Sequence, residues 1–165
     1  MIRRTTLSDI ASVMEVIADA QQRLRNAGVD QWQDGYPTAE IIKGDIARGE
    51  SFVYTIDNQI IATAVISFAG EPTYATIDGS WIDNAPYVVI HRLAVRAGFE
   101  RQRLALKMFD FAHSAALERG VTSARVDTHQ DNIAMRNLLT QQGYILCGEI
   151  VLQSGAKRIA YQKRL

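Results

Sequence analysis

The most constraining feature of the sequence is an apolar stretch that runs through a turn into a helical pattern. Residues 87–95 are almost all apolar and rich in β-branched side chains, which is typical of a strand at the middle of a sheet. Leu104, Met108 and Phe111 then recur at helical spacing, and residues 123–128 again read as a strand. A strand, a helix and a second strand in this order predict a parallel pair of strands at mid-sheet.

The segments on either side of this unit predict hairpins. Residues 52–56 and 59–68 are rich in strand formers and flank Asp57-Asn58, a dipeptide that suits a tight turn because both residues tolerate positive φ. A final hairpin is predicted over residues 144–152 and 157–162. Hairpins join antiparallel strands, so the sheet should be mixed and mainly antiparallel.

Apolar residues at helical spacing predict three further helices. They begin near Ser8, near Thr38 and at Asn132. Ser8 and Thr38 can cap the first two, because a hydroxyl oxygen accepts from the free amides of a first turn. The predicted fold is therefore α/β, with a mixed, mainly antiparallel central sheet, a parallel pair at mid-sheet and flanking helices.

Length and charge limit the classes of function. A chain of 165 residues predicts one domain, over residues 1–165. Basic and acidic residues number 18 each, so no positive field exists to hold a phosphate backbone, and we expect no nucleic-acid partner. The sheet edges that such a fold exposes would allow a homodimer.

The chain carries no feature of a secreted or membrane protein. Cys147 is the single cysteine, and one thiol cannot form an internal disulfide, which fits a reducing compartment. The N-terminus lacks the apolar run of a signal peptide, and no stretch approaches the roughly 18 apolar residues of a membrane span. We expect a cytoplasmic location and no membrane partner.

The turn between the mid-sheet strand and the following helix, residues 96–105, suits an anion. The first amides of a helix have no acceptor inside the helix and carry the positive end of its dipole. A helix that starts directly after a strand therefore presents a site for a phosphate or pyrophosphate.

Two motifs resemble the GNAT superfamily of N-acetyltransferases. The family has a strand ending like Arg-Leu-Ala-Val, then Arg/Gln-x-x-Gly-x-Gly/Ala at the helix start. Residues 92–95 match the strand, Glu100 falls at the Arg/Gln position, Arg103 at the first glycine, and Ala105 matches. The second family motif, an Asn followed by a helix ending in Gly-Phe/Tyr, matches Asn132 to Tyr144.

The resemblance implies an enzyme that moves an acetyl group from acetyl-coenzyme A to an amine of a small molecule or peptide by direct attack. It also implies that two strands splay apart and that main-chain groups between them hold the acyl-pantetheine arm. The cofactor-binding residues implied are Leu93, Val95, Arg101, Gln102, Arg103, Leu104, Ala105 and Asn132.

Two departures from the family pattern keep alternatives open. Arg103 replaces a glycine that lets the main chain approach the pyrophosphate; its side chain can point away, or pair with a phosphate. Leu139 stands where many members have a tyrosine thought to protonate the leaving thiolate, which leucine cannot do. A non-catalytic acyl-CoA-binding module is therefore the alternative function, and a domain for another phosphate ligand is a third.

His91 and His129 are the candidate catalytic residues. A lysine-like amine has a pKa of about 10.4 and must lose a proton before attack, so a base that works near pH 7 helps. His91 can equally be a core histidine with a satisfied hydrogen bond, and His129 a loop or capping residue. Asn132 can likewise only satisfy the main chain at its helix start, in place of a cofactor contact.

Several other aromatic and polar residues allow a functional or a purely structural interpretation. Trp32 and Tyr36 lie in a polar loop that in this family covers the acceptor, but they can also only anchor a surface loop. Asp127 can simply tie a loop together. His113 should be solvated on the polar side of its helix, and Cys147 is expected to be inert packing. No metal site is assigned.

Overall fold

The chain divides into two compact units, each described here by itself. The computed structural model describes residues 1–165, apart from the side chain of Arg101. The first unit comprises Met1–Ile66 and His91–Phe111, and the second comprises Ser67–Ile90 and Ala112–Leu165. Strand β5 (Val88–Val95) and helix α3 (Leu104–Leu117) each contribute residues to both units.

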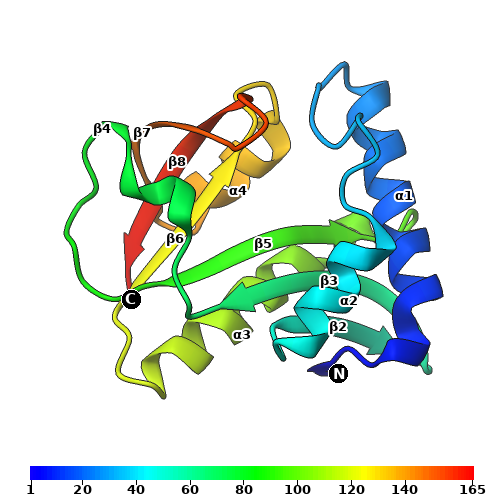
Figure 1. The fold of residues 1–165 in the computed structure, drawn as a ribbon. Coiled ribbons are helices and arrows are strands. Elements are labelled where there is room, and N and C mark those ends of the chain that lie inside the picture. Colours follow the sequence, from blue (N-terminus) through cyan, green and yellow to red (C-terminus); the bar gives the residue numbers. More distant parts are fainter. The chain divides into compact units, whose positions relative to one another are not determined.

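The first unit is built from antiparallel strands and helices. Strand β1 (Ile2–Arg4) pairs with β2 (Ser51–Ile56), and β2 pairs with β3 (Gln59–Ser67). Asp57 and Asn58 turn the β2–β3 hairpin with φ of 48° and 63°, as their dipeptide predicts. Helices α1 (Ile10–Asn26) and α2 (Ala39–Ala47) lie side by side (Figure 1).

Buried side chains lie on both faces of these strands. One cluster joins α1 and α2 to β2, β3 and β5, and consists of Val13, Val16, Ile17, Ala20, Ile42, Val53, Ile60 and Ala94. The other joins β3 to the start of α3, and consists of Ile61, Ala62, Ala64, Leu104 and Met108. Two helices therefore cover one face of the first unit's strands, and the start of α3 covers the other.

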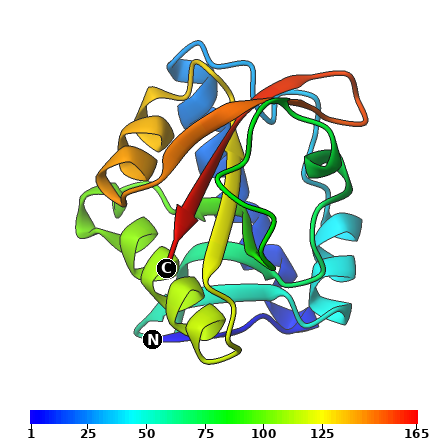
Figure 2. The same cartoon turned by 90° about the vertical axis from the view of Figure 1, so that its left-hand side faces the viewer.

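The second unit contains the parallel pair. Val88 and Val89 of β5 pair in parallel with Ala124 and Arg125 of β6 (Ser123–Thr128). Three antiparallel pairs follow: β6 with β8 (Lys157–Arg164), β8 with β7 (Ile145–Val151), and β7 with β4 (Asp78–Gly79). Figure 2 shows β6, β8 and β7 next to one another, beside α4 (Ile133–Gln141).

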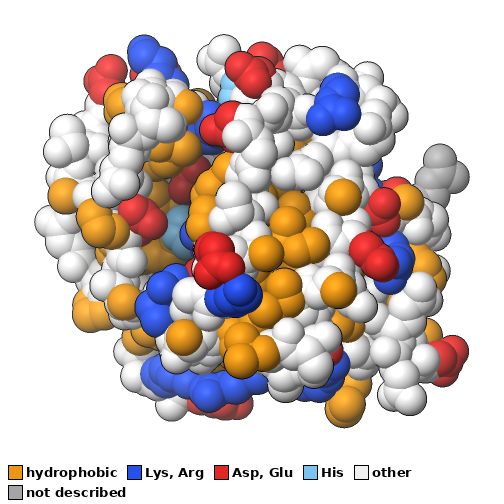
Figure 3. All heavy atoms as spheres, turned by 45° about the vertical axis from the view of Figure 1, so that its right-hand side comes forward, with side chains coloured by type: hydrophobic (Ala, Val, Ile, Leu, Met, Phe, Trp, Pro, Cys, Tyr) orange, Lys and Arg blue, Asp and Glu red, His pale blue; other side chains and the backbone are white. Residues whose placement is uncertain are grey.

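The predicted fold class is confirmed: the strands are mainly antiparallel with one parallel pair, and helices flank them. The prediction of one domain over residues 1–165 stays a prediction. One difference lies at residues 70–86, expected as a loop, where the chain forms a 3-10 turn at Pro72–Ala75 and the short strand β4. No helix in the described part of the chain is long and apolar enough to cross a membrane. Basic and acidic side chains are interspersed on the face in Figure 3.

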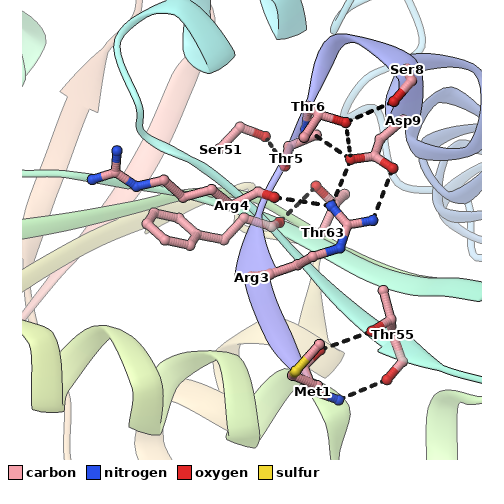
Figure 4. Close-up of polar contacts among 11 residues, drawn as sticks. Met1, Arg3, Arg4, Thr5, Thr6, Ser8, Asp9, Ser51, Thr55 and Thr63 are labelled. Atoms are coloured by element: carbon pink, nitrogen blue, oxygen red, sulfur yellow. Dashed lines mark hydrogen bonds and ion pairs between the residues drawn. The ribbon is translucent and has the colours of Figure 1, made fainter. Parts of the chain in front are cut away.

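The N-terminal strand is fixed by polar contacts (Figure 4). Arg3 donates from both terminal nitrogens to the Asp9 carboxylate, at 2.7 and 2.9 Å. The same carboxylate accepts from the main-chain amide and the hydroxyl of Thr6, both at 2.8 Å. Thr6, rather than the predicted Ser8, therefore caps the first helical turn, because Asp9 three residues later completes a capping box. Thr38 caps α2 as predicted, accepting from the Ile41 amide.

Replacing Asp9 by asparagine should lower the free energy of unfolding by about 1–2 kcal/mol at pH 7, because a cap and a charged pair are both weakened. The hydrogen bonds from Arg3 hold the pKa of Asp9 well below its usual range. A lowered folded pKa gives stability that is present above about pH 4 and lost as the pH falls further. Urea unfolding of wild type and Asp9→Asn should show a gap that narrows in acid, and a gap independent of pH would contradict this account.

Candidate active site

The turn into α3 has the main-chain form that the glycine of the family motif would favour. Residues Glu100–Gln102 form a 3-10 turn, and Arg103 then adopts the left-handed conformation with φ 57° and ψ 27°. Helix α3 starts directly afterwards at Leu104. Of its first four amides, that of Lys107 donates to the Arg103 carbonyl, and the other three have no acceptor within the helix. The turn therefore has a main-chain form that suits an anion, although arginine replaces glycine.

The side chains of this turn face different surroundings. Those of Gln102 and Arg103 are exposed. Leu104 is 1% exposed and packs in the core, so only its main chain is available to a cofactor. Ala105 is half-buried. The side chain of Arg101, also predicted to bind the cofactor, lies outside the described part of the chain.

Side chains of helix α1 hold the turn through contacts with Glu100 and with the main chain on either side of Arg96. Arg23 pairs with Glu100 at 2.9 Å and donates to the Val95 carbonyl at 2.7 Å. The Ala97 amide donates to the Asp19 carboxylate at 2.9 Å. Glu100, which replaces a basic residue of the family motif, therefore has its charge balanced by Arg23. The Val95 carbonyl, predicted to hold the pantetheine arm, already accepts one hydrogen bond.

Strand β5 departs from strand geometry at Arg92, where φ is 51°. We call this the Arg92 kink. The Arg92 guanidinium lies 3.1 Å from the Asp45 carboxylate, which is fully buried on α2 and also pairs with Arg48. Burial is the largest influence on Asp45 and raises the pKa of its carboxyl, while Arg92 and Arg48 oppose the shift. The predictions missed Asp45, although it lies at helical spacing from Ile42 on the inward face of α2.

His91 lies in the same part of the first unit. Its side chain is half-buried, and it is near enough to Asp45 for its positive charge to lower the pKa of that carboxyl. His91 thus has the acidic side chain of Asp45 as a neighbour. This surrounding suits a base, but a structural histidine would also occupy it.

The loop between α1 and α2 places Tyr36 beside Arg92 of β5 and packs Trp32 against the core. The Tyr36 ring lies 5.5 Å from the Arg92 guanidinium, and the Tyr36 carbonyl accepts from Gln21 of α1 at 2.9 Å. Trp32 is partly buried against the core cluster of α1 and α2. Trp32 therefore anchors the loop, whereas the Tyr36 ring lies beside Arg92, the residue after His91.

His129 and Asn132 lie in the second unit, before α4. Asn132 caps this helix, since its side-chain oxygen accepts from the Met135 amide at 3.1 Å. His129 is largely buried, and its Nδ1 accepts from the Asp131 amide at 3.1 Å. A neutral ring that accepts at Nδ1 carries its proton on Nε2, as inferred from this hydrogen bond. In this form of the ring, Nε2–H is available as a hydrogen-bond donor.

A buried tyrosine–carboxylate pair was not predicted. The Tyr74 hydroxyl donates to the Asp127 carboxylate at 2.7 Å, and Tyr74 is 2% exposed. Burial and the negative charge of Asp127 raise the pKa of Tyr74 well above its usual value. Asp127 does hold a loop in place, which is the structural role that the sequence allowed for it. Its partner is the Tyr74 hydroxyl, on a segment that was expected to have no regular structure.

Arg125 forms the second unpredicted arrangement, two residues earlier on the same face of β6. Its guanidinium lies 4.0 Å from the Trp81 ring and 4.1 Å from the Tyr87 ring, so the cation is held between two aromatic faces. It also donates to the Asp83 carbonyl at 2.7 Å. The signal in the sequence was the alternation of Arg125 and Asp127 with small apolar residues along one strand.

Two minor predictions concern His113 and Cys147. His113 was expected to be solvated, and this is wrong: it is 9% exposed and lies 2.7 Å from the Tyr144 hydroxyl. Burial raises the pKa of Cys147, which keeps the thiol protonated and fits inert packing. Leu139 is fully buried in the core. Within the described residues, no three His, Cys, Asp or Glu side chains are grouped to hold a metal ion.

Comparisons with known proteins agree with this geometry. Residues 15–144 match the family model of the acetyltransferase (GNAT) family. A GNAT-family acetyltransferase from Streptococcus agalactiae is 31% identical, with a TM-score of 0.88, and the match covers 100% of this chain and 95% of that one. The uncharacterized N-acetyltransferase YesJ of Bacillus subtilis is 26% identical over 85% of this chain and 78% of its own length.

A more distant structure shares the fold. The PaiA N-acetyltransferase of Thermoplasma acidophilum, solved in complex with coenzyme A, has a TM-score of 0.75 at 13% identity, covering 100% of this chain and 98% of that one. The family model spans most of the chain, and the resemblance seen in the two sequence motifs is thereby confirmed. The chain belongs to the acetyltransferase (GNAT) family.

Proposed function

We propose that the protein transfers an acetyl group from acetyl-coenzyme A to an amine of a small molecule or peptide. The observation that carries this proposal is the turn at Arg103, which leads into a helix start whose first amides lack acceptors within the helix, next to exposed Gln102 and Arg103. Such a turn suits a pyrophosphate. The coenzyme A bound to the PaiA relative supports the same cofactor here. Asn132 would lie on the cofactor side, as in the family motif.

The reaction assigned to the site is direct attack on the thioester. The amine nitrogen bonds to the carbonyl carbon, its proton passes to His91, and the carbon–sulfur bond breaks. The thiolate then takes a proton, for which His129 in its protonated, imidazolium form is the proposed donor because the Leu139 side chain has no proton to give. Main-chain groups of Leu93 and Val95 would hold the acyl arm, and a strand amide would stabilise the oxyanion. Trp32 and Tyr36 would border the acceptor, Trp32 by anchoring the loop.

A mixture of the protein, acetyl-coenzyme A and a panel of amines, monitored for free thiol, tests this function. Turnover is expected with at least one amine. Binding without turnover would favour the alternative, a non-catalytic acyl-CoA-binding module. The third possibility, a domain for another phosphate ligand, is tested by comparing the thermal shifts caused by acetyl-coenzyme A, ATP and NAD. A ligand at 100 times its Kd stabilises the folded protein by about 2.7 kcal/mol. No shift with saturating acetyl-coenzyme A would refute the proposal.

Replacing Arg103 by glycine should keep the main-chain turn and raise the free energy of unfolding by about 0.5–1 kcal/mol. Glycine adopts the observed φ of 57° without the steric penalty that arginine carries. Arg103→Glu is the matched variant: it keeps the penalty and places a negative charge beside the pyrophosphate. Calorimetry should show weaker acetyl-coenzyme A binding for Arg103→Glu than for Arg103→Gly. An equal Kd for both variants would show that this side chain points away from the ligand.

A further inference from the structure

The Arg92 kink lies directly before the main chain that the proposed function assigns to the acyl arm. Arg92 has a φ of 51° inside β5, a conformation that residues with a Cβ rarely adopt. Leu93 and Val95 follow it in the same strand. The direction in which their main-chain groups point therefore depends on the kink, and some interaction must hold a non-glycine residue in this conformation.

The Asp45 carboxylate supplies that interaction. Nη1 of Arg92 lies 3.2 Å from Oδ1 and 3.1 Å from Oδ2 of Asp45, which is fully buried. Arg92 is itself largely buried, and its Nε has no hydrogen-bond partner among the described residues. Two charges taken out of water in this way must stay together, because separation leaves each without its counter-charge. The Tyr36 ring, 5.5 Å from the guanidinium, confines it further.

We propose that Asp45 is a positioning residue: by pairing with Arg92 it holds the kink and so directs the β5 main chain toward the thioester. This inference rests on the proposed function and deepens it. It gives neither side chain a chemical step. Helix α2, which carries no predicted site residue, thereby contributes to the geometry of the reaction.

Two double variants test the role. Asp45→Asn with Arg92→Gly, and Asp45→Asn with Arg92→Ala, both remove the ion pair without leaving a buried charge. They differ in one respect, because only glycine adopts positive φ at no cost. We would measure kcat, KM and Kd for acetyl-coenzyme A, and Tm, with Glu40→Gln on the exposed face of α2 as an unperturbed control.

The glycine form should keep kcat/KM within about threefold of wild type, and the alanine form should lose about 10- to 100-fold, the scale of a misplaced reacting group. Equal loss in both forms, with Tm and Kd preserved, would overturn the proposal, because the guanidinium would then act on the reactants directly. A difference in Tm without one in kcat/KM would also overturn it, leaving a purely structural pair. If the proposed function itself is wrong, the wild-type protein will not turn over acetyl-coenzyme A, and this result is distinct from any difference between the variants.

Discussion

Replacing His91 by alanine should lower kcat by about 100-fold or more, the usual contribution of a positioned general base. The loss should appear in the chemical step, because a general base acts when the amine gives up its proton. Binding of acetyl-coenzyme A should be unchanged, since the turn at Arg103 is separate from the imidazole. Steady-state kinetics with the best amine of the panel, together with calorimetry, measures both quantities.

The pH profile identifies the role of His91 more closely. In wild type, the acidic limb of kcat/KM against pH reports the base of the free enzyme. That limb should disappear in His91→Ala, and added imidazole should restore part of the rate. His129→Ala is the matched comparison, because a proton donor affects the departure of the thiolate and should leave the acidic limb in place. Full activity of His91→Ala would remove His91 from the site.

The sequence predicted those parts of the fold that depend on local patterns. The β2–β3 hairpin, the Thr38 cap and the bounds of β6 follow from turn chemistry, capping and composition within a few residues. The parallel pair was predicted too, because a strand, a helix and a strand in succession have few alternatives. Each of these depends on neighbours in the sequence.

The unpredicted site residues depend on partners far apart in the chain. Asp45 is buried because Arg92, 47 residues away, meets it across two elements. Asp127 meets Tyr74 at a separation of 53 residues. A polar residue in an apolar pattern indicates that some partner exists, but it does not identify the partner. The spacing of Asp45 from Ile42 is compatible with an inward position on α2, but it does not indicate the partner Arg92 or the kink.

Replacing Gly79 by alanine should lower the free energy of unfolding by about 3 kcal/mol or more, through strain and overpacking together. Gly79 has a φ of 134°, and a Cβ built there would lie 2.2 Å from the Cys147 carbonyl oxygen. Both atoms belong to the β4–β7 pair, so neither can rotate away as a flexible side chain would. A drop in Tm of about 6–12 °C is expected for a chain of this length.

A second glycine separates the two causes of this loss. Gly155 also has positive φ, 84°, but no atom lies within 4 Å of a Cβ built there. Gly155→Ala should therefore cost only the backbone strain, about 1 kcal/mol. The difference between the variants measures the close approach of β4 to β7. Strand β4 follows shortly after the 3-10 turn that contains Tyr74, whose hydroxyl bonds to Asp127. Gly79→Ala should therefore also weaken the contact between Tyr74 and Asp127. The weakening should be visible as a loss of hydrogen-exchange protection near Tyr74. Equal losses in Gly79→Ala and Gly155→Ala would show that β4 yields freely and that its pairing with β7 does not hold this segment.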